Sequence, residues 1–518
     1  MRSFFYEQPW GLLSAAVLAV LYLLAALPLL WALQLENYRP RKMLPAARRI
    51  SRGYLPALLG LSVLCAGLLL LPEYGIGASF LVMLAGHLGL LIGDAKRSKK
   101  TPLKFTARLK RLAAACWLWM FAAGALFRPA QSCLFCFLPL FVWLGWLVTR
   151  PLEGLIAARY LAACRKKLEA APHLVRIGIT GSAGKTTAKH ILTAMLAPKF
   201  RVLATPKSFN TPLGVTRCVL GADLNEYDVF LAEMGARRRG DILALCRLVR
   251  PTVGVLTAVL PQHLESFGDL QTVTAAKFEL LDFLEEEEGS LAVNGEDPNI
   301  AAELSRRQSA RVIASGEGGE VFAREVRVGP EGLSFRLCFA EGECFDCRTQ
   351  LLGSHNLGNI LLCALVARRL GVSPAEIAAA VRDLQPVPHR LQLLKAVNCL
   401  ILDDSYNANA EGAAQALKTL SALPGTRFVV TPGLVEGGES QEGQNRTLGG
   451  EAALCCDFCL FVGGNAPALK RGALAAGMPG ERVLTFGSLS EASRALAALM
   501  KDSPQNAVLF ENDLPDNY

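Results

Sequence analysis

The sequence predicts an α-helical transmembrane N-terminal region followed by α/β structure: a central parallel-sheet domain with a phosphate loop and a C-terminal Rossmann-like α/β domain. Three observations carry this prediction. The apolar excess of the chain is confined to residues 1–149. A β-branched run, a glycine-rich turn and a helical segment follow one another over residues 175–196. From about residue 386 onward, short apolar runs alternate with helical stretches, which is typical of a second α/β domain.

The length of 518 residues is too great for one hydrophobic core, so several domains are expected. We predict a transmembrane anchor region over 1–150, an amphipathic linker helix over 151–172, a central domain over 173–385 and a C-terminal domain over 386–518. The linker is predicted because apolar and basic side chains alternate with helical spacing, as in helices that lie along a membrane surface. These side chains are Leu155, Ala158, Tyr160, Leu161 and Leu168 against Arg159, Arg165, Lys166 and Lys167.

Charge and cysteine content exclude two classes of protein. The net charge of +9 does not indicate a nucleic-acid partner, because the basic residues concentrate in short loops between apolar runs, where positive charge reports membrane orientation. The fifteen cysteines are scattered, so we expect reduced thiols in a cytosolic domain rather than a disulfide framework. The pairs Cys344/Cys347 and Cys456/Cys459 have the spacing of zinc half-sites, but the sequence supplies no accompanying cluster of His or acidic ligands.

Three segments without Asp, Glu, Lys or Arg, 10–33, 54–72 and 75–93, are each near the roughly 20 residues that a membrane-spanning helix needs. The apolar core of the first is too long for a cleavable signal peptide, so we expect it to stay as an anchor. Two shorter runs, 112–127 and 133–149, are compatible with two short spans or with a re-entrant hairpin. Both alternatives return the chain to the same side of the lipid bilayer.

The distribution of positive charge predicts the orientation of these segments. Two loops are rich in basic residues, whereas the turns between them carry only Glu73 and Arg128. The positive-inside rule therefore places both basic loops, and everything after residue 150, in the cytoplasm, with the N-terminus outside. His87, within the third segment, is expected to be a packing residue. The basic residues are Arg39, Arg41, Lys42, Arg48, Arg49 and Arg52 in the first loop, and Lys96, Arg97, Lys99, Lys100, Lys104, Arg108, Lys110 and Arg111 in the second.

The central domain begins with a candidate phosphate loop, in which the run VRIGIT leads into GSAGKTT. Gly181 and Gly184 let backbone N–H groups converge on phosphate oxygens, and the N-terminus of the following helix adds a positive field. Lys185 would reach the terminal phosphates, and the hydroxyl of Thr186, next to Thr187, is a magnesium ligand in such loops. The motif departs from the strict GxxxxGK[ST] form, because an isoleucine stands at the first glycine position. We nevertheless expect a P-loop ATPase domain that binds ATP and Mg²⁺.

Three further residues of the same domain, Glu233, His263 and Lys277, are assigned to predicted elements. The run YDVFLAEMGA reads as a strand that ends in Glu233, and a carboxylate at the carboxyl end of a parallel strand lies beside the phosphate loop. Glu233 is therefore a candidate magnesium ligand. His263 falls on a loop and Lys277 in a helix, and each taken alone is more typical of a structural or solvated residue.

Residues 175–518 contain six motifs in the order in which they occur in the Mur ligase family, and this part of the chain resembles that family. The resemblance is greatest to the members that add D-alanyl-D-alanine. The motifs are GSAGKTTAKHIL, AEMGARRRGDI, HLESFGDLQTVTAAKFEL, GSHNLGNILLCAL, HRLQLL and DDSYNANAEGAAQAL. The resemblance implies that Thr186 and Glu233 hold one magnesium ion, that His263 holds a second, and that Lys277 is carbamylated by carbon dioxide near that metal.

The resemblance also implies which residues contact the nucleotide and the acceptor. The expected contacts are His355, Asn356 and Asn359 to the nucleotide, Arg390 to its terminal phosphate, Asp404 and Tyr406 to ATP from the C-terminal domain, and Asn210 and Thr211 to the acceptor.

The implied chemistry is ATP-dependent formation of an amide bond through an acyl phosphate, in the synthesis of peptidoglycan precursors. The expected partners are a carboxylate-bearing cell-wall precursor and an amino acid or dipeptide. Membrane segments stand where soluble members carry a domain that grips a UDP-sugar, so lipid-linked and polymeric substrates are also compatible. Two alternatives stay open: a membrane ligase similar to poly-γ-glutamate synthase, and a P-loop ATPase that forms no bond.

Overall fold

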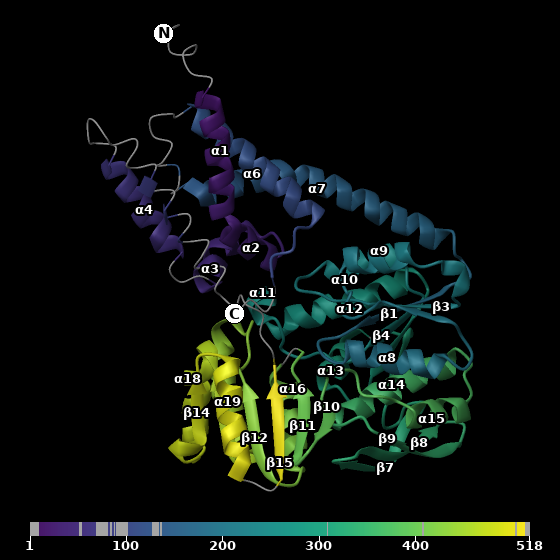
Figure 1. Cartoon of the computed structure of the whole chain (residues 1–518). Helices are drawn as coiled ribbons and strands as arrows, with labels where there is room; N and C mark the ends of the chain where they lie inside the picture. The colour runs from purple at the N-terminus through teal and green to yellow at the C-terminus, as the bar shows by residue number, and fades with distance from the viewer. Residues whose placement is uncertain are drawn as a thin grey trace. The chain divides into compact units, whose positions relative to one another are not determined.

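The computed structural model describes residues 10–50, 54–68, 81–82, 85–86, 89, 102–126, 134, 137–307, 309–406, 409–502 and 505–512. Contacts within the chain divide it into two compact units, residues 1–158 and 159–513, and each is described by itself (Figure 1). The span predicted over 75–93, with His87, falls almost entirely outside the described residues.

The first unit is helical, as the sequence predicts. Helices α6 and α7 are each long and apolar enough to cross a membrane, and α1 and α2 pass the same test only together, as a pair bent by 45°. The segment predicted as one span over 10–33 is divided in the structure into two helices, α1 and α2, which meet at this bend. The helices of this unit are α1 (Trp10–Ala25), α2 (Leu27–Leu35), α3 (Pro40–Ile50), α4 (Tyr54–Leu68), α6 (Ala107–Leu126) and α7 (Leu138–Glu169).

The boundary that we predicted at residue 150 is not a helix end. Helix α7 runs without a break through Pro151, so the expected linker helix is the second half of α7. Pro151 removes one backbone hydrogen bond of the helix. The helix nevertheless continues past Pro151 and Gly154 to Glu169. Helix α6 likewise starts before the predicted residue 112, and its Arg111 donates to Glu153 of α7 over 2.6 Å.

The second unit opens with a six-stranded parallel sheet in the order β2-β3-β1-β4-β5-β6. This confirms the predicted parallel sheet. Its strands are β1 (Val175–Thr180), β2 (Val202–Ala204), β3 (Val229–Glu233), β4 (Val253–Leu256), β5 (Ser290–Asn294) and β6 (Val312–Ser315). The helices of this domain are α8 (Lys185–Leu196), α9 (Pro212–Gly221), α10 (Asp241–Val249), α11 (Leu264–Phe267), α12 (Leu270–Glu286), α13 (Pro298–Arg307), α14 (His355–Arg369) and α15 (Pro374–Arg382).

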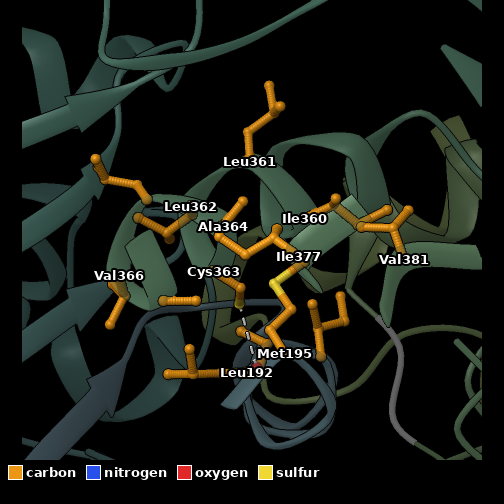
Figure 2. Packing of buried hydrophobic residues seen from close by; sticks show 14 of the residues in the cluster. Leu192, Met195, Ile360, Leu361, Leu362, Cys363, Ala364, Val366, Ile377 and Val381 are labelled. Carbon is orange, nitrogen blue, oxygen red and sulfur yellow. Dashed lines mark hydrogen bonds between the residues drawn. The ribbon is translucent and has the colours of Figure 1, made fainter. Parts of the chain in front are cut away.

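Two hydrophobic cores cover the two faces of the sheet. Helices α8, α14 and α15 pack on one face, and α9, α10 and α12 pack on the other. Helix α8 takes its place because its buried residues recur at helical spacing, at Ala188, Ile191, Leu192 and Met195. Figure 2 shows Leu192 and Met195 facing the buried side chains of α14 and α15, and the Cys363 thiol donates to the carbonyl oxygen of Ala188 over 3.3 Å.

An antiparallel sheet is inserted between β6 and α14. It comprises β7 (Val321–Gly329), β8 (Gly332–Phe339) and β9 (Cys344–Thr349), and its inner face joins the same core as α8 and α14. Cys338 and Cys344 lie opposite each other on β8 and β9 and form a disulfide. The expectation of reduced thiols is therefore wrong for this pair, and Cys344 is not free to form a zinc half-site with Cys347.

The C-terminal domain contains a second sheet, in the order β10-β11-β15-β12-β13-β14, in which only β10 is antiparallel to its neighbour. Helices α16, α17 and α18 cover one face and α19 the other. The elements are β10 (Gln392–Ala396), β11 (Cys399–Asp404), β12 (Thr426–Thr431), β13 (Phe458–Val462), β14 (Val483–Phe486), β15 (Asn506–Glu511), α16 (Ala410–Ser421), α17 (Gln441–Cys455), α18 (Ala466–Ala475) and α19 (Leu489–Leu499).

Candidate active site

The phosphate loop joins the carboxyl end of β1 to the N-terminus of α8, as predicted. Gly181 and Gly184 adopt φ values of 149° and 79°, in the region that favours glycine. A Cβ at Gly181 would lie 2.0 Å from the hydroxyl oxygen of Thr257, and one at Gly184 would lie 2.6 Å from the amide oxygen of Asn359. The loop therefore keeps its backbone open to an anion only with glycine at both positions.

The N-terminal turn of α8 carries the residues expected at the phosphates, Lys185, Thr186 and Thr187. The Nζ of Lys185 donates to the carbonyl oxygens of Gly181 and Ser182 over 2.7 and 3.0 Å, which keeps the ammonium group over the loop. Desolvation, with a smaller contribution from Arg390, lowers the pKa of Lys185 to about 8, although Glu233 opposes the shift. A positive side chain and free helix N–H groups make this turn a site for phosphate oxygens.

Glu233 ends β3 beside this turn and is almost fully buried. Its Oε2 accepts from the hydroxyl of Thr186 over 3.1 Å and from Nζ of Lys189 over 2.9 Å, and its Oε1 accepts from Nδ2 of Asn210 over 3.2 Å. Thr186 and Glu233, the expected magnesium ligands, are thus brought together. Lys189, which we did not predict, already neutralises the carboxylate from the next turn of α8.

The loop over 205–211, which holds the predicted acceptor contacts Asn210 and Thr211 and is called the acceptor loop below, is joined to the same carboxylate. The backbone carbonyl oxygen of Asn210 accepts from the backbone N–H of Gly235 over 2.8 Å. Nζ of Lys189 donates to the backbone carbonyl oxygen of Lys207. Thr211 caps α9, where its side chain accepts from the backbone N–H of Gly214. Asn210 is therefore tied to Glu233, and Thr211 caps the start of α9. Their contact with an acceptor stays a prediction.

Lys277 lies in the middle of α12 with its side chain buried. Desolvation lowers its pKa to about 7, and the neighbouring charge of Lys185 lowers it further, while Glu279 and Asp241 oppose the shift. A lysine amine in this state is largely neutral slightly above neutral pH and is a nucleophile. The sequence-based interpretation of Lys277 as a solvated helix residue is thus wrong, and burial is compatible with its implied carbamylation.

His263 lies on the loop after β4, as predicted, at the N-cap of α11. Its Nδ1 contacts the carboxylate of Glu436, which belongs to the C-terminal domain. The second carboxylate oxygen of Glu436 lies 3.3 Å from the guanidinium of Arg237. Sequence reasoning missed Glu436 because the contact joins residues 173 positions apart. Its position after β12, at the carboxyl end of a parallel strand, was the one available signal.

Arg390, Asp404 and Tyr406 form a group in the C-terminal domain. The guanidinium of Arg390 lies over the ring of Tyr406, 4.2 Å from its centroid, and the Tyr406 hydroxyl contacts the hydroxyl of Ser208 in the acceptor loop. Desolvation lowers the pKa of Arg390, although Asp404 opposes the shift. Desolvation also raises the pKa of Asp404 to about 6, and its Oδ1 accepts from the backbone N–H of Leu391.

The expected nucleotide contacts on α14 are only partly brought to the loop. Asn359 packs against Gly184, and its Nδ2 donates to Oδ1 of Asn356 over 3.3 Å. Asn356 in turn donates to the carbonyl oxygen of Leu352 over 2.7 Å. The ring of His355 instead packs against Gly353, at the exposed start of the helix.

The donor set fits magnesium held together with phosphates. A hydroxyl and a carboxylate lie within 3.1 Å at the phosphate loop, and hard oxygen ligands of this kind suit Mg²⁺, which is commonly bound by one or two protein groups plus substrate phosphates. Within the part of the chain that the structure describes, no group of three or more His, Cys, Asp and Glu side chains is arranged to hold a metal ion. The zinc half-site of Cys456 and Cys459 accordingly lacks further ligands of these types there.

Comparison with known proteins relates both α/β domains to one family. Residues 179–367 match the Mur ligase middle domain, and residues 389–510 match the Mur ligase glutamate ligase domain. The UDP-N-acetylmuramoyl-tripeptide–D-alanyl-D-alanine ligase of Mycobacterium tuberculosis is 34% identical over 252 residues, which are 48% of this chain and 49% of that protein. The Escherichia coli ligase of the same name is 31% identical over 298 residues, which are 57% of this chain and 66% of that protein.

Solved structures give the same relationship. The crystal structure of MurF from Acinetobacter baumannii matches with a TM-score of 0.64 and 27% identity, over 69% of this chain and 77% of that chain. MurF ligase from Thermotoga maritima in complex with ADP matches with a TM-score of 0.59 and 25% identity, over 69% and 80% of the two chains. The chain spans about half of the length of the mycobacterial relatives that it matches.

Proposed function

Since the chain belongs to the Mur ligase family, both of whose domain models it matches, we propose that it is an ATP- and magnesium-dependent ligase of the MurF type. It joins a carboxylate of a peptidoglycan precursor to the amine of an amino acid or dipeptide. The proposal extends to this chain the reaction named for its relatives, the addition of D-alanyl-D-alanine to UDP-N-acetylmuramoyl-tripeptide.

One observation carries the proposal: a phosphate loop, a buried lysine of lowered pKa and an arginine from the second domain share one electrostatic environment. Lys185 affects the pKa of Lys277, and Arg390 and Glu233 affect that of Lys185. A phosphate loop that only hydrolyses ATP has no need of Lys277 or of an acceptor loop tied to Glu233 through Asn210. This arrangement therefore favours the ligase over the plain ATPase.

The reaction that we propose has two steps. A carboxylate oxygen attacks the γ-phosphorus of ATP and ADP leaves, which gives an acyl phosphate. The amine then attacks the acyl carbon, inorganic phosphate leaves and the amine loses a proton. Both steps build negative charge on oxygen atoms, which the preorganised cations Lys185 and Arg390 stabilise. Magnesium bound through Thr186 and Glu233 supplies further charge stabilisation at the phosphates.

Lys277 contributes a negative charge in this scheme. Its neutral amine attacks the carbon atom of carbon dioxide, a nitrogen–carbon bond forms as one carbon–oxygen π bond opens, and the nitrogen releases one proton, so that a neutral amine becomes a negatively charged carbamate. The low pKa of Lys277 supports the reaction, because only the neutral amine is a nucleophile. The change of sign removes the repulsion that an ammonium group would exert on bound metal and on Lys185.

We propose that the reaction takes place at the cytoplasmic face of a membrane. Two long apolar helices, α6 and α7, support an anchored enzyme by their length and composition, and the basic loops support a cytoplasmic catalytic part. ATP and wall precursors meet on that side of the bilayer.

The test is a screen of carboxylates and amines for ADP release by the full-length protein in detergent micelles. UDP-N-acetylmuramoyl-tripeptide with D-alanyl-D-alanine is the first pair, lipid-linked precursors are the second, and glutamate polymers are the third. We expect ADP release only when carboxylate and amine are both present, with a product heavier than the carboxylate by the amine less one water. ADP release that ignores both substrates would identify a plain ATPase instead.

A further inference from the structure

The carboxyl group of Glu511 is buried in the C-terminal domain without a partner for either oxygen. Glu511 is the last residue of β15, a strand in the interior of the C-terminal sheet, and it is 1% exposed. Within the described part of the chain, no donor lies within hydrogen-bond distance of Oε1 or Oε2. Buried polar groups of folded proteins nearly always have partners, so an exception requires an explanation.

Asp404 stands beside Glu511 at the same edge of the sheet. The two residues are register partners on the parallel strands β11 and β15, and each is the last residue of its strand. Register partners direct their side chains to the same face of a sheet, which is here the face that α16 and α17 cover. Asp404 is partly exposed, and its Oδ1 accepts from the backbone N–H of Leu391. Its Oδ2 has no hydrogen-bond partner among the described residues.

The backbone next to Glu511 is held by loops that follow two neighbouring strands. The N–H of Asn512 donates to the carbonyl oxygen of Asp404 over 3.2 Å, and Nδ2 of Asn512 donates to the carbonyl oxygen of Gly433 over 2.8 Å. Buried Asn445 holds the loop around Gly433 through two bonds to the backbone of the next residue. The carboxyl group is therefore fixed at the carboxyl edge of a parallel sheet, where α/β proteins bind their ligands.

The fold itself supplies no positive charge to this carboxyl group. Helix α16 begins on the same side of the sheet, but its N-cap is Asn409, whose Oδ1 accepts from the backbone N–H of Gly412 over 2.8 Å. Desolvation, and then the charge of Asp404, raise the pKa of Glu511 well above its usual range, and no cation of the described chain opposes this shift. Burial of an unpaired carboxyl destabilises a fold, so its presence here points to a ligand.

We propose that Glu511, together with Asp404, binds the ammonium group of the amine substrate. A primary ammonium group has three N–H donors, and the pair offers three oxygens without partners, which are Oε1 and Oε2 of Glu511 and Oδ2 of Asp404. The partly exposed Asp404 marks the side on which the rest of the substrate extends. A metal ion fits less well, because the described residues include no group of three or more His, Cys, Asp and Glu side chains arranged to hold one.

The ammonium site borders the group that we expect at the terminal phosphate. Asp404 affects the pKa of Arg390, and Arg390 affects that of Lys185 in the phosphate loop. An amine held at Glu511 is therefore on the side of the site where the acyl phosphate forms. The inference rests on the proposed function in taking the bound cation to be the amine substrate.

Binding of an ammonium group can be measured without any ligation assay. Melting temperatures of the full-length protein in detergent micelles are compared at pH 8 and constant ionic strength in methylammonium, tetramethylammonium and potassium chloride. A ligand that binds the folded state raises the melting temperature. We expect the highest value for wild type in methylammonium, because tetramethylammonium has the same charge but no N–H group. Glu511→Gln should show no such preference, whereas Glu481→Gln, at an exposed position, should retain it.

The second readout is kinetic and uses the amine that supports ADP release in the substrate screen. A hydrogen bond to a charged group contributes about tenfold or more to binding, so we expect Glu511→Gln to raise KM for the amine by about tenfold or more. KM for ATP should not change. Glu511→Asp, which keeps the charge on a shorter side chain, should lie between wild type and Glu511→Gln.

Three results would overturn the proposal. One is a wild-type protein that methylammonium stabilises no more than tetramethylammonium or potassium does, and another is a preference for methylammonium that persists in Glu511→Gln. The third is an unchanged KM for the amine in an active Glu511→Gln enzyme, which would refute this inference while supporting the ligase. A preference for methylammonium that depends on Glu511, without amine-dependent ADP release, would instead support the ammonium site and refute the proposed ligase activity.

Discussion

Lys189 and Glu233 form an ion pair with 2.9 Å between Nζ and Oε2, in which the two side chains are 3% and 1% exposed. Removing one partner of a buried pair leaves an uncompensated charge and costs about 3 kcal/mol or more. We therefore expect Lys189→Met to lower the free energy of unfolding by about that amount, measured by chemical unfolding in detergent micelles. The double variant Lys189→Met/Glu233→Gln should recover most of the loss. A single variant as stable as wild type would show that Glu233 is protonated or paired elsewhere.

Lys185 should be needed for phosphoryl transfer but not for folding or membrane insertion. Loss of one preorganised group that stabilises transition-state charge typically costs 10²- to 10³-fold in rate, so we expect at least a hundredfold loss of amine-dependent ADP release in Lys185→Ala. Membrane extraction and thermal stability should not change. Lys418→Ala, an exposed lysine on α16, serves as the control. Full activity in Lys185→Ala would contradict the phosphate-loop assignment.

The low pKa of Lys277 predicts a pH and bicarbonate dependence. Because the folded-state pKa is lowered to about 7, the amine is protonated below this pH and neutral above it. Carbamylation, and the activity that depends on it, should therefore rise as the pH increases through 7, and should fall when dissolved carbon dioxide is removed. Lys277→Ala should lose most activity, regain part of it with acetate or formate, and no longer respond to bicarbonate. Activity that is indifferent to this substitution would remove Lys277 from the site.

Glu511 predicts a second pH effect, on stability. It stands opposite Asp404 on adjacent parallel strands, both of its carboxyl oxygens are buried, and among the described residues neither has a hydrogen-bond partner. Desolvation, and then the charge of Asp404, raise the pKa of Glu511 well above its usual range. A raised folded-state pKa stabilises the fold below the unfolded-state pKa, and this stability is lost as the pH rises through the folded-state value.

Glu511→Gln should therefore stabilise the protein more at pH 8 than at pH 5, because the amide stays neutral while the wild-type carboxyl is driven to ionise. Melting temperatures at the two pH values measure the difference, and Glu481→Gln, at an exposed position, is the control. Equal destabilisation at both pH values would mean that Glu511 is ionised and balanced by a cation.

The basic loops predict the orientation of the membrane segments. We expect an alkaline phosphatase fused after Tyr518 to be inactive and a fluorescent protein fused there to be bright, because the fourteen basic residues of the two loops favour the cytoplasmic side. The opposite pattern would overturn both the orientation and the access of the site to cytosolic ATP.

The sequence predicted the features that depend on local pattern. The strand over 175–180, the glycine turn and the start of α8 follow from residues that are neighbours in the chain, and the structure confirms them. The end of β3 at Glu233 was equally predictable. Helix α7 continues through residue 150, where we placed the boundary between the anchor region and the linker helix, because helix-favouring residues stand on both sides of Pro151.

The features that escaped prediction are pairings over long distances in the chain. Lys189 looks like an ordinary helix residue, and only its position within the apolar stripe of α8 hinted at burial. Its partner is 44 residues away, and the partner of His263 is 173 residues away. The broken first span, α1 with α2, was also missed, because hydropathy records which residues are apolar but not where the helix axis bends.

The packing of α8 on α14 determines which parts of the site are able to move. The helix that begins with Lys185 and the helix that carries Asn359 share one buried core, tied at its centre by Cys363 and Ala188 (Figure 2). Cores of this density do not deform gradually, so the two walls of the nucleotide site behave as a single solid piece. A ligand that contacts both Lys185 and Asn359 would therefore meet two groups whose spacing is already set by the core beneath them.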